Sequence, residues 1–161
     1  MLEWLELTPY AFWIQTSLYG WAIMLTFHAF GNAVIVGTIF IVALRLFGTF
    51  RPLPYTFLRK LMPLIWIGLV VQVLSGFSLF LTKPVRYLSD GLFQWKLGLV
   101  VAGIVATIYL QKSLERDAAG WEGTNSVSVY GKRFVTATAI VWAAVLIMGR
   151  LTAYVGQLYR V

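Results

Sequence analysis

Four long apolar stretches constrain this chain more than any other feature of its sequence. The longest covers residues 17–48 and is an almost unbroken run of apolar side chains. A helix needs about 20 apolar residues to cross the hydrocarbon core of a bilayer. The sequence therefore predicts an all-α integral membrane bundle of four transmembrane helices within one domain, residues 17–161. The predicted spans are about residues 18–46, 61–81, 92–110 and 134–155. Most connections between them are short, which favours up-down topology.

The composition agrees with a multi-pass membrane protein. Hydrophobic residues make up 60% of the chain and charged residues 12%, a balance unlike that of soluble domains. The chain has no cysteine, which excludes disulfides and thiolate metal sites formed by this chain alone. The formal net charge is +7, but the bases cluster at the ends of the spans. Membrane topology and anionic lipid explain this pattern better than nucleic-acid binding does.

The first 16 residues form a separate segment. It is rich in Trp and Tyr, and Pro9 interrupts it. Aromatic rings of this kind sit at the membrane–water interface, so Trp4, Tyr10 and Trp13 are predicted anchors of an interfacial segment. Because the segment carries two acidic residues and no base, it lacks the positive region of a secretory signal, and we expect it to be retained.

The distribution of bases predicts an orientation. In membrane proteins the loops on the cytoplasmic side carry an excess of Lys and Arg. The connections after spans one and three carry eight bases: Arg45, Arg51, Arg59, Lys60, Lys112, Arg116, Lys132 and Arg133. The opposite side carries five: Lys83, Arg86, Lys96, Arg150 and Arg160. We therefore expect both termini on the non-cytoplasmic side.

A few polar residues interrupt the spans and are the candidate functional residues. His28 and Asn32 share one face of span one with Gly31, and Gln72 and Ser75 lie on a small and polar face of span two. Small residues at this spacing allow transmembrane helices to pack closely, and polar ones bond across the interface. Helix packing is the favoured interpretation of Asn32, Gln72 and Ser75. Asn32 and Gln72 lie at similar depth, which allows a hydrogen bond between them.

His28 is the only histidine of the chain, and three interpretations compete for it. It is a buried ring hydrogen-bonded to a neighbouring helix, a ligand of haem iron, or a proton relay. Neutral imidazole is a common axial ligand of haem. Relay is the weakest interpretation, because the predicted spans contain no Asp or Glu. The packing and haem interpretations both stay open.

Two bases in the same half of the bilayer extend the haem interpretation. Arg150 near the end of span four either reaches outward to lipid head groups or pairs with a haem propionate. Lys96, at the start of span three, likewise either reaches the lipid head groups or pairs with a haem propionate.

Short motifs carry a resemblance over residues 18–112. They are HAFGNAVIVGT and ALRLFG in span one, LSGFSLFL in span two and FQWKLGLV at the start of span three. In these the chain resembles small bacterial four-helix membrane proteins with a first-span histidine. It is more distantly similar to HemJ-type protoporphyrinogen oxidases and CopD-like membrane domains. The resemblance implies a bacterial inner-membrane protein with haem on His28 and an important Lys96. The spans hold no second histidine, so a bis-histidine haem needs a ligand from another chain.

These observations predict a subunit of a larger membrane assembly. Such a subunit has two possible functions. In one, His28 binds b-type haem for electron transfer or porphyrin chemistry; in the alternative, the subunit is haem-free and structural. We expect contacts with the lipid bilayer and with other membrane chains, in a homo- or hetero-oligomer. A small-molecule transporter is the third possibility, weakened by the absence of acidic residues and repeats in the spans. The sequence contains no independent catalytic constellation.

Overall fold

The computed structural model describes residues 3–124 and 126–158, with side chains of the last helix to residue 152, and every element in this part is a helix. The short helices are α1 (Glu3–Glu6), α2 (Pro9–Thr16) and α5 (Pro84–Ser89). The long helices are α3 (Gly20–Leu46), α4 (Tyr55–Leu81), α6 (Gly91–Thr124) and α7 (Val129–Leu158). All four long helices are long and apolar enough to cross a membrane. The predicted all-α class with four candidate spans is thus confirmed.

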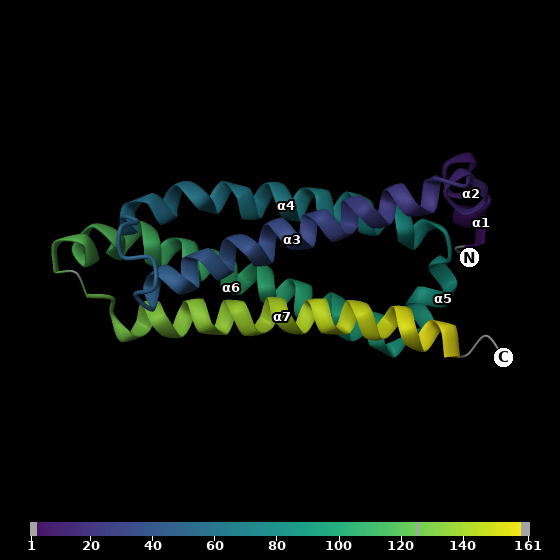
Figure 1. The fold of residues 1–161 in the computed structure, drawn as a ribbon. Helices are drawn as coiled ribbons and strands as arrows, with labels where there is room; N and C mark the ends of the chain where they lie inside the picture. Colours follow the sequence, from purple (N-terminus) through teal and green to yellow (C-terminus); the bar gives the residue numbers. More distant parts are fainter. Residues whose placement is uncertain (1–2, 125, 159–161) are drawn as a thin grey trace.

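The four long helices form a ring of neighbours. α3 packs mainly on α4, and α6 packs mainly on α7, while α3 also contacts α7 and α4 contacts α6. Figure 1 shows the α3–α4 and α6–α7 connections at one end of the bundle, here called the loop end. Helices α2 and α5 lie at the opposite end, here called the α5 end. Two helix pairs, α3–α4 and α6–α7, therefore make up the bundle.

Three of the long helices, α4, α6 and α7, are longer than the predicted spans. α4 begins at Tyr55, so Pro63 lies inside the helix rather than in its first turn. α6 continues through a charged segment to Thr124, and α5 forms within the predicted loop after span two. Pro52 and Pro54 make the segment before residue 61 resemble a loop, whereas the charged segment after residue 110 is expected to begin as a helical extension of span three. In the folded chain the helices continue because Leu58 on α4 and Leu114 on α6 are buried in the core.

The core lies toward the loop end. Its largest fully buried side chains include Ile39 on α3, Leu58 on α4, Leu110 on α6 and Trp142 on α7. Trp142 Nε1 donates to Thr107 Oγ1 at 3.0 Å, which links α7 to α6. At the α5 end the α6–α7 pair contributes almost nothing to the interior. No residue of 91–102 or of 146–152 is buried.

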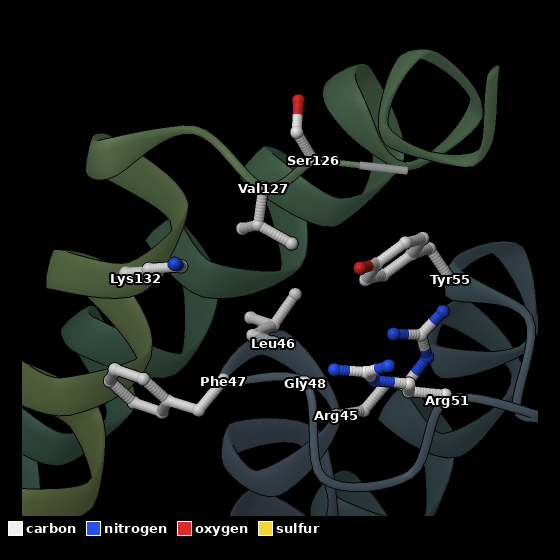
Figure 2. Close-up of a pocket in the computed structure, with 9 residues that line it drawn as sticks. All are labelled: Arg45, Leu46, Phe47, Gly48, Arg51, Tyr55, Ser126, Val127 and Lys132. Atoms are coloured by element: carbon white, nitrogen blue, oxygen red, sulfur yellow. The ribbon is translucent and has the colours of Figure 1, made fainter. Parts of the chain in front are cut away.

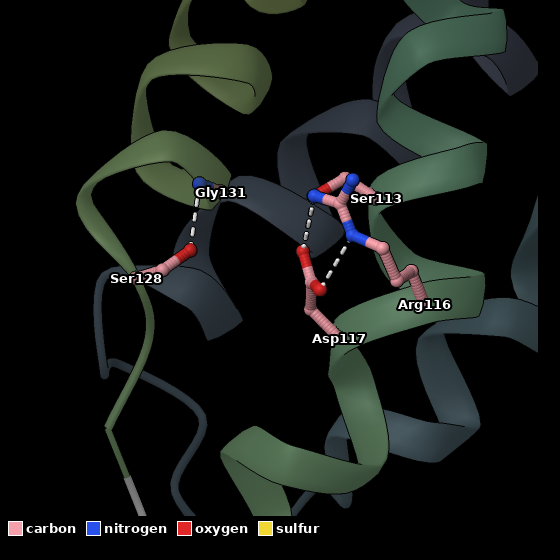
Figure 3. Close-up of polar contacts among 5 residues, drawn as sticks. All are labelled: Ser113, Arg116, Asp117, Ser128 and Gly131. Atoms are coloured by element: carbon pink, nitrogen blue, oxygen red, sulfur yellow. Dashed lines mark hydrogen bonds and ion pairs between the residues drawn. The ribbon is translucent and has the colours of Figure 1, made fainter.

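Both connections at the loop end have defined caps. Gly48 has a φ of 92°, and the N–H groups of Thr49 and Gly48 donate to the carbonyls of Leu44 and Arg45. This is a Schellman motif, which requires the left-handed backbone that glycine adopts most easily. At the start of α7 the Ser128 hydroxyl accepts from the Gly131 N–H at 3.1 Å (Figure 3).

Figure 3 also shows the exposed Arg116, which donates to the carboxylate of its neighbour Asp117 on α6. The Nε and a terminal nitrogen of Arg116 each reach one carboxylate oxygen, at 2.8 and 3.0 Å. This pair lies on the charged extension of α6 and contributes little to stability, because solvent screens exposed ion pairs.

The N-terminal segment packs against the α5 end. Thr8 caps α2 by accepting from the Ala11 N–H, and Ala11 and Ile14 are buried. The Tyr10 hydroxyl and the Ser78 hydroxyl are 2.9 Å apart, which ties α2 to α4. α2 is therefore part of the packed structure, whatever its position relative to a membrane.

Candidate functional site

The α3–α4 crossing is built on two glycines. A Cβ added to Gly31 would lie 2.9 Å from the Gly68 carbonyl oxygen, and one added to Gly68 would lie 3.1 Å from the Gly31 carbonyl oxygen. The Cα hydrogens of each glycine therefore point at the carbonyl of the other, a weak but reciprocal contact. Close backbone approach at small residues is the usual basis of helix association in lipid. Gly31 thus makes room for α4 and not for a flat ligand.

His28 lies about one turn before this crossing and is hydrogen-bonded on both sides of its ring. Its Nδ1 is 3.2 Å from Ser75 Oγ, and its Nε2 is 2.9 Å from Gln72 Nε2. Ser75 donates its own proton to the Val71 carbonyl at 2.6 Å, so it accepts from His28. This assigns the proton to Nδ1 and leaves Nε2 to accept from the Gln72 amide. The imidazole is neutral in this arrangement.

The four residues His28, Asn32, Gln72 and Ser75 are here called the polar seam. Gln72 and Ser75 are buried, while His28 and Asn32 are half-buried. The hydrogen bond expected between Asn32 and Gln72 does not form; the Gln72 amide nitrogen instead contacts His28 Nε2. Asn32 Oδ1 and Gln72 Oε1 are buried and have no hydrogen-bond partner in the structure. The polar seam therefore has two unused acceptors.

Lys96 joins this region from α6. Its Nζ lies opposite Gly149 of α7, 3.7 Å from where a Cβ would stand, and it is close enough to His28 to interact electrostatically. Among the described residues Lys96 has no hydrogen-bond or ion-pair partner. Arg150 is exposed and does not join the group. Lys96 is thus within electrostatic range of His28, whereas Arg150 is not part of this group.

The hydrogen bonds of His28 test how well these residues fit haem iron. A ligating histidine usually donates one ring N–H to a protein acceptor, as Nδ1 does to Ser75, and binds the metal with the other nitrogen. Here that other nitrogen, Nε2, faces the buried amide of Gln72. Gly76 packs against the ring at Cε1. As arranged, His28 leaves no nitrogen free for iron, and ligation requires Gln72 to move away.

Across residues 3–124 and 126–152 no cluster of three or more His, Asp or Glu side chains is able to hold a metal ion. The polar seam contains an imidazole, two amides and a hydroxyl. This set joins helices and binds hydrogen-bonding groups, but it offers neither an acid nor an activated nucleophile.

Sequence reasoning missed one interior residue. Arg45 falls within the predicted span 18–46 and is counted with the bases of the connection that follows, but its burial is not predicted: in the last turn of α3 it is only 3% exposed. Its Nε donates to the Leu53 carbonyl, and its guanidinium stacks 3.6 Å above the centre of the Tyr55 ring. The available signal was the ALRLFG motif, in which a glycine that ends the helix follows three residues after a cation.

Comparison with protein-family models, with curated proteins and with solved structures gave no match to this chain. The class that the structure itself defines is a bundle with four helices of membrane-spanning length and composition.

Proposed function

We propose that this chain is an accessory subunit of a larger membrane assembly, in which another membrane chain packs against the α5 end of α6 and α7. One observation carries the proposal. In this half of the bundle, residues 91–102 and 146–152 contribute no buried side chain. The polar seam joins α3 to α4 at the same level by hydrogen bonds. The α6–α7 pair is joined to them at this end by a ring contact, Phe80 on Phe93 at 6.0 Å, and by no hydrogen bond among the described residues.

The chemistry of this surface favours a protein partner over lipid alone. Trp95 and Val101 on α6 and Ile147 on α7 are 72%, 61% and 59% exposed, which suits lipid or a partner equally. Lys96 is different, since a half-buried ammonium without an acidic partner is costly at hydrocarbon depth. A second chain that supplies a carboxylate or carbonyl oxygens satisfies this charge.

In the proposed topology the four long helices cross a bacterial inner membrane in up-down order. The loop end faces the cytoplasm because most bases lie there, and both termini lie on the other side. α1 and α2 lie at the outer interface, where the exposed Trp4 and Trp13 act as anchors. Cysteines introduced at Ser126 and Leu7 test this in intact cells with an impermeant thiol reagent. Labelling at Ser126 but not at Leu7 contradicts the orientation.

Site-specific photo-crosslinking tests the assembly. A photoreactive residue at Trp95 should give a crosslinked product of higher mass in native membranes. The matched control is Leu74 on α4, which is 63% exposed at the same end but on the other helix pair. Equal crosslinking at both positions, or a monomer alone after solubilisation in mild detergent, contradicts the proposal.

Haem binding is the second candidate, favoured by the proximity of Lys96 to His28 and by the resemblance noted above. Here Lys96 would pair with a propionate and His28 would bind the iron. A visible spectrum and a pyridine haemochrome assay on protein purified with its native partners decide between the candidates. A Soret band that His28→Ala abolishes and Gln72→Ala preserves supports haem, because Gln72 competes for Nε2. A colourless protein removes the cofactor and leaves the accessory subunit.

A further inference from the structure

A cavity of about 420 Å³ opens at the loop end, between the α3–α4 connection and the start of α7 (Figure 2). Its volume falls in the range of about 300–1,000 Å³ that is typical of ligand pockets. Three of its lining residues are cations, namely Arg45, Arg51 and Lys132, and no acidic residue lines it. In Figure 2 Arg51 and Tyr55 stand on one side and Lys132 faces them from the other.

Arg45 is the strongest evidence for a ligand. It is 97% buried, and a guanidinium stays charged in proteins, so its burial is costly unless an anion compensates it. The Leu53 carbonyl and the Tyr55 ring engage Nε and the face of the group. Among the described residues no carboxylate pairs with Arg45, and its two terminal nitrogens make no hydrogen bond. Arg45 itself lines the cavity.

The backbone around the cavity holds the cations in place. The Schellman motif at Gly48 turns the chain so that Arg45 and Arg51 flank the same opening. The N-terminal ends of α4 and α7 also border it, at Tyr55 and just after Val127. Helix N-termini carry partial positive charge, while the C-terminus of α3 offsets part of it. The cavity is therefore preformed and electropositive.

We propose that this cavity binds a phosphate group. Two arginines offer planar forks that match phosphate oxygens, and Lys132 supplies a point charge from the opposite wall. Ser126 adds a hydroxyl at the rim. Because the cavity lies at the end of four membrane-spanning helices, the head group of an anionic phospholipid is the nearest source. Basic pockets between spans on the cytoplasmic side bind such lipids. A soluble phosphate compound has the same chemistry.

The test compares two doubly neutralised variants of the full chain. Arg51→Gln with Lys132→Gln removes two exposed cations of the cavity. Lys112→Gln with Arg133→Gln removes two exposed cations of the same end that do not line it. Net charge changes equally, so diffuse attraction to anionic membranes affects both alike. Circular dichroism and gel filtration confirm that each variant folds.

The first arm uses nanodiscs of phosphatidylcholine with increasing phosphatidylglycerol, and native mass spectrometry counts retained lipid. We expect the wild type and the control variant to retain phosphatidylglycerol. The cavity variant should lose about tenfold or more in affinity, the usual scale for losing charge-assisted hydrogen bonds. The second arm titrates lipid-depleted protein in detergent with inorganic phosphate and glycerol phosphate.

The outcomes separate the sources. Loss confined to the cavity variant in the first arm assigns the site to a lipid head group. The same pattern in the second arm, without preference for phosphatidylglycerol, assigns it to a soluble phosphate. If neither ligand binds, or if both variants lose binding equally, the cavity is no phosphate site.

Discussion

The Gly31–Gly68 crossing makes the sharpest prediction about stability. Gly31→Ala places a methyl group 2.9 Å from the Gly68 carbonyl oxygen and 3.0 Å from the Gln72 backbone nitrogen. Ordinary contacts begin at about 3.4 Å, so the two helices must separate by about half an ångström. Both obstacles are backbone atoms of a helix, which cannot rotate away as a side chain can. The strain must therefore move α4 as a whole.

The size of the effect follows from three terms. Overpacking of a tight interface costs about 1–3 kcal/mol. Each weakened Cα–H···O contact adds about 0.5–1 kcal/mol. Alanine, in contrast, gains about 1 kcal/mol over glycine in helix propensity. Gly37 lies on the same helix with nothing within 4 Å of an added Cβ, so Gly37→Ala measures the propensity gain alone. Because the propensity gain is common to both variants, Gly31→Ala should be less stable than Gly37→Ala by about 1.5–4 kcal/mol.

Unfolding by SDS in mixed micelles, followed by tryptophan fluorescence, measures this difference. The buried Trp142 reports the loss of the packed bundle. Gly68→Ala should fall between the other two variants, because its first obstacle is Cγ1 of the Ile35 side chain, which can shift. Equal transition midpoints for Gly31→Ala and Gly37→Ala would show that the helices do not cross at Gly31.

Three further predictions concern single contacts. His28→Ala and Gln72→Ala in a double-mutant cycle should show a coupling of about 0.6 kcal/mol, the average for hydrogen bonds between membrane helices, measured by the same SDS titration. No coupling would mean that the 2.9 Å contact contributes nothing. Gly48→Ala should lower the free energy of unfolding by about 1 kcal/mol, because alanine is strained at this left-handed φ although nothing lies within 4 Å of its Cβ. Gly91→Ala, whose Cβ also has nothing within 4 Å, should not lower it. Trp142→Phe should lower the unfolding midpoint more than Trp95→Phe, because only Trp142 is buried and bonded to Thr107.

The spans and the small-residue faces were predictable because each depends on local sequence. An apolar run reveals a span, and the spacing of Gly68, Gln72 and Ser75 reveals a helix face, without knowledge of the partner. The choice of hydrogen-bond partner was not predictable. Gln72 bonds His28 and not Asn32 because the rotation of α3 about its axis, fixed by the glycine crossing, brings the imidazole to the amide.

The buried Arg45 and the cavity were also beyond local reasoning. In the sequence, Arg45 cannot be told apart from other basic residues at the end of a span, which are normally exposed. It is buried because Leu53 and Tyr55 fold back over it. Lys132 reaches the same cavity from far along the chain. Lys96 and Arg150 looked equivalent in sequence, but α6 turns Lys96 toward the bundle whereas Arg150 is exposed.

The distribution of polar contacts explains why the α5 end should receive a partner. Within α3–α4 the polar seam and the glycine crossing act together, and within α6–α7 Thr107 bonds Trp142. Between the pairs, the described hydrogen bonds join Trp66 to Gln111 and Thr56 to Glu122, all toward the loop end. Among the described residues, hydrogen bonds thus join the two pairs only toward the loop end. At the α5 end the pairs meet through aromatic rings, where Phe80 of α4 stacks on Phe93 of α6 at 6.0 Å. A helix that packs on α6 and α7 at the α5 end, as we propose, therefore displaces none of the described hydrogen bonds between the pairs, and it covers the half-buried Lys96.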